Sequence, residues 1–199
     1  MRARRGEAQD IPAVPAANLR PGGGRYVALY DISSEDIDKT IIHMLMASWG
    51  MEKSHHSTDL LKVTERVYFQ QIAVPRTGTS PGPGDTEDFL YLVRIACCRD
   101  HESEAKFNSW YDRTYLPVVL QTPGFVKATR YHLYWVLMDE PVKVPPFLTV
   151  FEIKAPSAER ALEALRGTAQ KLSQSGQISS LYVEEGSAIF RKIKDVAKQ

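Results

Sequence analysis

The clearest alternation of apolar and polar residues lies in the second half of the chain, where it predicts six elements. Apolar and aromatic runs indicate half-buried strands, and apolar residues spaced three or four apart indicate helices, as with the stripe formed by Phe107, Trp110 and Tyr111. The predicted elements are strand 89–97, helix 102–120 (kinked or ended at Pro117), strand 125–136, strand 147–154, helix 157–174 (capped by Ser157), and strand 180–192 (broken near Gly186). This β-α-β-β-α-β order is the split arrangement of ferredoxin-like α+β domains.

The first half of the chain carries a shorter pattern, which predicts a β-α-β unit over residues 26–74. Residues 26–32 form an apolar and aromatic run, and residues 33–36 supply an N-cap and acidic residues for a following helix. The remaining expected elements are helical residues at 34–47 and 56–66, separated near Gly50, and a strand at 67–74.

Two segments lack such a pattern. Residues 1–25 contain five arginines, three prolines and four glycines without periodic apolar positions, so we expect a flexible lead-in. Residues 75–88 contain three prolines and three glycines, which is typical of an exposed linker. The chain therefore divides into this lead-in, the unit 26–74, the linker, and the unit 89–193.

An internal repeat relates the two units. A shift of 121 positions aligns Tyr30-Asp31-Ile32 with Phe151-Glu152-Ile153, and Phe69 with Phe190. The chain is therefore expected to contain one complete ferredoxin-like module and only the second, β-α-β half of another. In a ferredoxin-like sheet the strand order is four-one-three-two, so a half-module lacks the strand between its strands three and four. Two explanations stay open: a truncated chain, or missing strands supplied by another subunit.

A set of motifs runs through the complete unit. Asn108-Ser109-Trp110-Tyr111-Asp112 leads into Tyr115-Leu116-Pro117, and Pro123-Gly124 and Arg130-Tyr131 follow in order. This series resembles the EthD-like branch of the dimeric α+β-barrel superfamily, over residues 25–193. The resemblance implies two ferredoxin-like modules packed sheet to sheet around a shared barrel. It also implies small aromatic, polyketide-like or lactone substrates, with isomerisation, cyclisation, decarboxylation or oxidation as the chemistry.

Tyr115 occupies the position where the resembled family usually has a histidine. A histidine takes and gives protons near neutral pH, whereas a tyrosine with a pKa near 10 is a weak base that donates a hydrogen bond or acts as an acid. The complete unit therefore uses another acid/base group or has no catalysis of this type, and whether the chain is an enzyme stays open.

Strand alternation gathers further polar residues at a predicted pocket. Arg130, His132 and Tyr134 share one face of strand 125–136, while Arg94 and Glu152 lie on strands 89–97 and 147–154. If these faces meet inside a barrel, the three charged residues form one cluster. One interpretation is a pocket for an anionic or phenolic ligand. The other is a structural ion pair between arginine and glutamate at a sheet interface.

The candidates under the first interpretation fall into two groups. The catalytic candidates are His132 as acid/base, Tyr115 and Arg130. The substrate-binding candidates are Arg94, Tyr134, Glu152 and Trp110, of which Trp110 is most simply interpreted as a core residue of the helix packed on the sheet. The leading hypothesis is cofactor-free proton transfer on a small aromatic or polyketide-type molecule, as in an isomerase, cyclase or decarboxylase. The alternative is a non-catalytic or degenerate protein of the same fold that serves binding or dimerisation.

Composition limits the partners. Of 199 residues 43% are apolar and 25% charged, as in an ordinary globular protein, and 25 basic against 24 acidic residues leave a net charge of +1. Such a balance gives no electrostatic reason to expect nucleic acid or an anionic membrane as partner, and no apolar run reaches the roughly 18 residues of a spanning helix. A small-molecule ligand and a homodimer remain the expected partners.

No cofactor is expected from the sequence. No nucleotide or flavin motif is present, His43, His55 and His56 form no recognisable ligand set, and the adjacent Cys97 and Cys98 are too few for a zinc site. We expect reduced cysteines and, because the basic N-terminus is followed by no apolar signal region, a cytoplasmic location.

Overall fold

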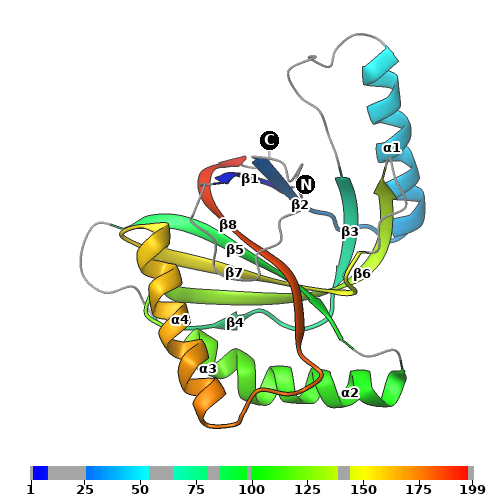
Figure 1. The fold of residues 1–199 in the computed structure, drawn as a ribbon. Helices are drawn as coiled ribbons and strands as arrows, with labels where there is room; N and C mark the ends of the chain where they lie inside the picture. Colours follow the sequence, from blue (N-terminus) through cyan, green and yellow to red (C-terminus); the bar gives the residue numbers. More distant parts are fainter. Residues whose placement is uncertain are drawn as a thin grey trace.

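The computed structural model describes residues 2–8, 26–53, 65–79, 86–97, 100–138 and 144–196, which adopt a mixed α+β fold (Figure 1). Within these ranges, none of the helices is long and apolar enough to cross a membrane. The elements are β1 (Arg2–Ala8), β2 (Tyr26–Asp31), α1 (Ile37–Lys53), β3 (Glu65–Gln71), β4 (Arg76–Thr77), β5 (Glu87–Ala96), α2 (His101–Trp110), the π-helical turn η1 (Tyr111–Tyr115), α3 (Leu116–Leu120), β6 (Phe125–Met138), β7 (Phe147–Ala155), α4 (Ala158–Gln174) and β8 (Val183–Val196).

The β-α-β-β-α-β element order predicted for the second half of the chain is confirmed. β5, the α2–η1–α3 segment, β6, β7, α4 and β8 follow one another. Ser157 caps α4 as predicted, since its Oγ accepts a hydrogen bond from the Arg160 N–H at 3.3 Å. The predicted break near Gly186 is a β-bulge, because the pairing of β5 with β8 shifts register between Arg94 and Ile95.

All strands of the described part join in one sheet of eight, and every neighbouring pair is antiparallel. The order is β2-β1-β8-β5-β7-β6-β3, with the short β4 also paired to β6. Within the unit 87–196 the order β8-β5-β7-β6 places the fourth, first, third and second strands of that unit side by side. The remaining strands extend this sheet at both ends rather than forming a separate one.

The two faces of the sheet carry different apolar clusters. Helices α2, α3 and α4 lie on one face (Figure 1), over a core dominated by aromatic rings such as Phe89, Phe125 and Phe151. On the opposite face a smaller cluster is built from Leu90, Leu148 and Val150, and the partly buried Leu29, Leu92, Phe69 and Tyr131 pack against it. Alternate residues of β5 and β7 feed the two clusters, as strand geometry requires.

The helical segment after β5 is interrupted by a wider turn. Asp100 caps α2, with its carboxylate accepting a hydrogen bond from the Ser103 N–H at 2.9 Å. At the end of η1 the Leu116 N–H donates to the Tyr111 carbonyl, five residues back. The next residue, Pro117, has no N–H to donate, which agrees with the predicted interruption of the regular helix at this point.

The internal repeat is confirmed by the element bounds. A shift of 121 residues places α1 on α4 residue for residue, and it places β2 within β7 and β3 within β8. Asp36 caps α1 at the position that Ser157 has in α4, since its Oδ1 accepts a hydrogen bond from the Lys39 N–H at 3.0 Å. The half-unit therefore reproduces the second half of the complete unit.

Several predictions for the first half were wrong or lie outside the described ranges. Residues 1–25 are not wholly without regular structure, because β1 pairs with β2 on one side and β8 on the other. Main-chain hydrogen bonds of this kind need no apolar pattern in the strand itself. Residues 9–25 and 54–64 lie outside the described ranges. Most of the predicted helix 56–66 is therefore outside them, and its last two residues, 65 and 66, belong to β3.

Helix α1 was also expected to end before Gly50, but it continues to Lys53. A glycine inside a helix costs only about 1 kcal/mol relative to alanine, too little to end a helix by itself.

The predicted linker 75–88 was wrong at its start, where the structure has regular pairing. β4 pairs with β6, and the Gly78 N–H donates to the Val126 carbonyl at 2.9 Å. Residues 80–85 lie outside the described ranges.

Candidate functional site

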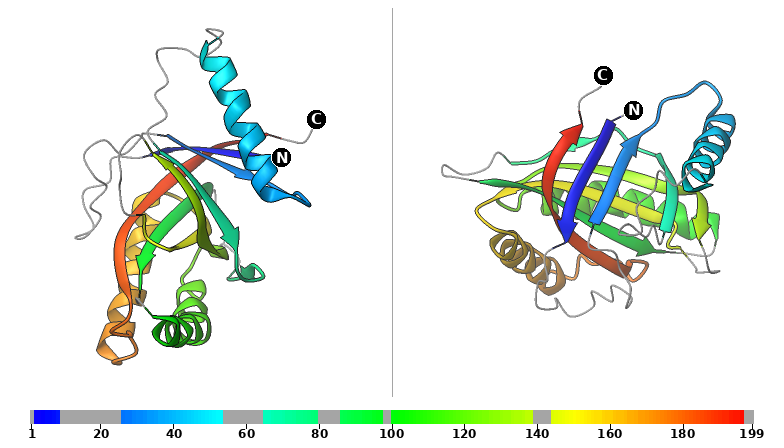
Figure 2. Two further views of the ribbon diagram at one scale, coloured as in Figure 1. Left: turned by 90° about the vertical axis from the view of Figure 1, so that its right-hand side faces the viewer. Right: turned by 90° about the horizontal axis from the view of Figure 1, so that it is seen from above.

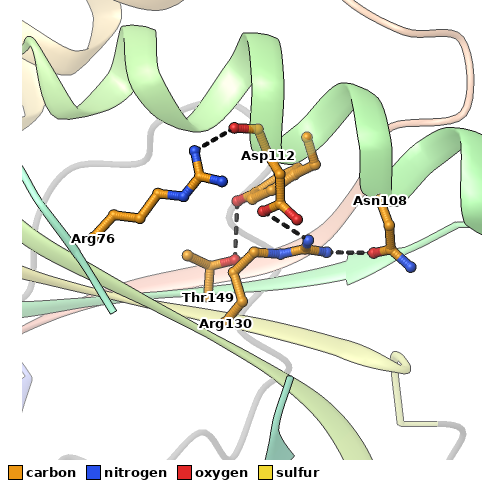
Figure 3. Close-up of polar contacts among 6 residues, drawn as sticks. Arg76, Asn108, Asp112, Arg130 and Thr149 are labelled. Atoms are coloured by element: carbon orange, nitrogen blue, oxygen red, sulfur yellow. Dashed lines mark hydrogen bonds and ion pairs between the residues drawn. The ribbon is translucent and has the colours of Figure 1, made fainter. Parts of the chain in front are cut away.

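Arg130 on β6 is a charged side chain in the interior of the helix-covered face, with only 3% of its surface exposed. Its Nη1 lies 3.0 Å from Asp112 Oδ1, and its Nη2 donates to Asn108 Oδ1 at 2.6 Å (Figure 3). The guanidinium carbon also lies 4.6 Å from the centre of the Tyr111 ring. One carboxylate, one amide and an aromatic face together compensate a charge that would be costly to bury alone.

The residues around Arg130 are themselves held in place. The main-chain oxygen of Asp112 accepts a hydrogen bond from Arg76 Nη1 at 2.5 Å, and the Tyr111 hydroxyl donates to Thr149 Oγ1 at 2.9 Å (Figure 3). Asp112 and Tyr111 both belong to η1, so the wide turn lies directly over the arginine. Such π-helical turns occur frequently at functional sites.

A hollow of about 300 Å³ opens beside this group, between α2–η1 and the edge of the sheet. His132 on β6 packs edge-on against the Phe147 ring, with ring centres 5.0 Å apart. The hollow is lined by both polar and apolar side chains: Ile72, Glu104, Asn108, Asp112, Arg130, His132 and Phe147. It therefore combines an ionisable imidazole, a fixed cation and an aromatic wall.

The charge of this lining disfavours an anion. Two carboxylates, Glu104 and Asp112, stand against one guanidinium, so these three groups together carry a net negative charge. Within the described part of the chain, Asp112 Oδ1 is buried and accepts no hydrogen bond beyond its ion pair with Arg130. The ion pair with Arg130 compensates this oxygen, and the exposed remainder of the Asp112 carboxylate is the part that can accept a hydrogen bond from a ligand hydroxyl.

A second and larger hollow, of about 510 Å³, lies between the β4 segment and α3. It is open, and its lining residues are Pro75, Arg76, Thr77, Gly78, Thr79, Pro117, Leu120 and Gln121. Arg76 is the one ionisable residue among them, and it already donates to the Asp112 carbonyl. This hollow has no acid/base group, so the His132 hollow is the better candidate site.

Tyr115 and Trp110, two of the candidates from the sequence, lie in an aromatic cluster rather than in the hollow. Rings of Trp110, Tyr111, Tyr115 and Tyr182 contact one another, with centres 4.9 to 6.4 Å apart. The Trp110 Nε1–H donates to the Gln177 carbonyl at 2.8 Å. These contacts assign Trp110 a packing role between the helix and the segment after α4.

The environment of Tyr115 keeps its hydroxyl protonated. Burial raises the pKa of Tyr115 to about 12, and its hydroxyl lies 3.3 Å from that of Tyr182, which in turn donates to Glu184. Burial also raises the pKa of Tyr111, Tyr182 and Tyr91 above the usual tyrosine value. Tyr115 is therefore unsuited to act as a base at physiological pH.

The predicted cluster of Arg94, Arg130 and Glu152 does not form. Glu152 lies on the face opposite Arg130, where its carboxylate pairs with Lys127 Nζ at 2.9 Å, and Arg94 shares that face with Leu90 and Leu92. The expected ion pair between Arg130 and a glutamate was also wrong, because the partner of Arg130 is Asp112. The pairing of β6 with β7 shifts by one residue between Phe125 and Lys127, and this shift places Glu152 on the face opposite Arg130.

Tyr134 is also separated from the hollow. The pairing of β3 with β6 shifts register between Tyr68 and Phe69, opposite Tyr134, so simple alternation fails there. The half-exposed Tyr134 hydroxyl donates to Asp38 of α1 at 2.5 Å. Of the seven candidates, only Arg130 and His132 line the hollow.

Three polar site residues, Glu104, Asn108 and Asp112, did not emerge from the sequence. They recur every four residues along the helical segment, a spacing that places side chains on one face of a helix. A polar stripe on the face that meets a sheet would have been the available signal. Asn108 and Asp112 were present in the quoted motif, but their roles as the partners of Arg130 were not predicted.

Comparisons with family models, with curated proteins and with solved structures find no match for this chain. Among the described residues, no group of three or more histidine, cysteine, aspartate or glutamate side chains could hold a metal ion. His55, His56 and Cys98 lie outside the described ranges. The site must therefore be interpreted from its own geometry.

Proposed function

We propose that this chain is an EthD-like α+β-barrel protein that binds a small aromatic or polyketide-type molecule and moves a proton on it without a cofactor. The observation that carries this proposal is the position of His132, which lines the hollow together with the buried Arg130 and the Phe147 ring. This arrangement supplies an acid/base group, a fixed positive charge and an aromatic contact within one small volume.

The topology supports the family assignment. The order β8-β5-β7-β6 is the four-one-three-two order of a ferredoxin-like module. The further pairings of β6 with β3 and of β8 with β1 join the complete unit to the incomplete one at both ends of its sheet. A barrel shared between two modules requires such a connection at both ends.

The proposed chemistry uses only side chains of the site. His132 accepts a proton from an acidic C–H group of an uncharged ligand, and the same imidazolium returns that proton to a different ligand atom, which gives a tautomer. Negative charge that develops on the ligand oxygen is stabilised by Arg130. A ligand hydroxyl donates to the exposed part of the Asp112 carboxylate, which lines the hollow.

Replacing His132 with glutamine tests the catalytic part of the proposal. With small β-diketones and polyhydroxylated aromatics as probes in D₂O, the wild-type chain is expected to accelerate the exchange of acidic C–H protons, followed by proton NMR. His132→Gln should lose about 10²-fold or more of that acceleration, the usual contribution of a general acid/base group. His43→Gln, on the exposed side of α1, is the matched control and should behave as wild type. Equal rates for wild type and His132→Gln would reject His132 as the acid/base.

A specific observation also favours the alternative of a non-catalytic binding or dimerisation protein. The charge of Arg130 is already engaged by Asp112 and Asn108, so a purely structural role accounts for its burial. Under this alternative the probes bind in the hollow without any acceleration of exchange. The same experiment therefore separates the two functions.

A further inference from the structure

The two halves of the chain are related by a pseudo-symmetry that leaves one position empty among the described residues. The repeat makes β2 and β3 the counterparts of β7 and β8. β1 is in turn the counterpart of β6. β1 pairs with β2 and β8, and β6 pairs with the corresponding strands β7 and β3. In the complete unit β7 and β8 both pair with β5, whereas β2 and β3 are the two end strands of the sheet and no described strand lies between them.

Strand direction shows that this position suits a single strand. Every neighbouring pair along the path from β2 to β3 is antiparallel, and the path contains seven strands, so β2 and β3 run in the same direction. One strand inserted between them would be antiparallel to both, as β5 is to β7 and β8. Direct pairing of β2 with β3 would instead give a parallel pair, which the rest of the sheet does not contain.

The two end strands converge on the same apolar cluster. Leu29 of β2 and Phe69 of β3 both pack against the cluster of Leu90, Leu148 and Val150, although they come from opposite ends of the sheet. The sheet therefore curves until both ends lie over its own inner face (Figure 2). A strand between them would place alternate side chains on this cluster.

The outer face of β2 is exposed where its counterpart is buried. Tyr26 and Tyr30 correspond to Phe147 and Phe151, which are 2% and 1% exposed in the complete unit. Phe147 is covered by Phe107 of α2 at 5.3 Å between ring centres. Tyr26 and Tyr30 are 61% and 45% exposed. Two aromatic side chains of β2 are thus exposed at positions whose counterparts on β7 are covered by α2 and the core.

We propose that β2 and β3 form a docking site for a strand–helix segment of a partner polypeptide, with the strand antiparallel to both and the helix over Tyr26 and Tyr30. The partner segment resembles β5–α2 in character: alternate apolar residues in the strand, then an aromatic stripe on the helix. A second copy of this chain does not fit, because its own β5 is held between β7 and β8. This inference is independent of the proposed function.

The test uses a synthetic peptide of residues 86–120 as the probe, added to the full chain. Backbone hydrogen exchange should slow by about tenfold or more in both 26–31 and 65–71, because pairing raises the free energy needed to open those amides. Exchange in β7 and β8 should not change. A control peptide with Leu90→Pro and Leu92→Pro cannot donate those hydrogen bonds and should give no protection.

Four results would overturn the docking site. The first is no protection by the peptide, and the second is protection of β2 or β3 alone. The third is protection by the proline peptide or a change in β7 and β8, which would indicate unspecific binding or displacement of β5. The fourth is a chain that is dimeric on its own with both end strands already protected, which would make a second copy the occupant.

Discussion

Replacing Asp112 with leucine is expected to lower the free energy of unfolding by about 3 kcal/mol, the cost of leaving a buried charge without its partner. Arg130 is 3% exposed, and Asp112 is the carboxylate that compensates it. Asp112 itself is 27% exposed, so the lower end of the usual range applies. Urea unfolding followed by circular dichroism measures the change.

The matched control is the double variant Asp112→Leu with Arg130→Met. Removing both charges leaves an apolar pair, which should recover most of the stability lost by Asp112→Leu alone. If Asp112→Leu alone is as stable as wild type, Arg130 is compensated by other groups, and the ion pair does not hold the site together.

A second large effect is expected at Phe147, where truncation to alanine should cost about 3 to 5 kcal/mol. The ring is 2% exposed and packs against Phe107 and His132. The matched variant is Tyr26→Ala at the repeat-related position on β2, where the ring is 61% exposed. That substitution should change stability by only about 0.5 kcal/mol, as is usual for surface positions.

Denaturant unfolding of both variants under the same conditions compares the two halves of the repeat directly. Similar losses for Phe147→Ala and Tyr26→Ala would mean that the outer face of β2 is covered in solution, contrary to the exposure of Tyr26. A small loss for Phe147→Ala would contradict the tight packing of the aromatic core beneath α2.

The sequence predicted a helix or strand correctly where the pattern that indicates it lies within the element itself. The alternation in β5, the apolar face of α4 and the Ser157 cap all concern residues close together in the chain, and the structure agrees with each. β1 is different, because its formation depends on main-chain partners in β2 and β8 rather than on a pattern within Arg2–Ala8. Gly50 was overinterpreted as a break, since a single glycine is tolerated inside a helix.

The candidate site could be predicted only in part, because alternation fixes faces within a strand but not between strands. Arg130 and His132 were placed together correctly, since both belong to β6. Glu152 was assigned to their face, yet the register of β6 against β7 puts it on the other face beside Lys127. Register depends on bulges and long-range pairing, which no local pattern in the sequence reveals.

An NMR titration tests whether a small uncharged ligand occupies the hollow next to His132. With a polyhydroxylated aromatic probe, the ring signals of His132 and the methyl signals of Ile72 should shift together and saturate, because both residues line the hollow. The methyl signals of Ile193, an exposed residue of β8, provide the reference and should stay unchanged. If the probes shift signals elsewhere while those of His132 and Ile72 stay unchanged, the hollow is not the binding site.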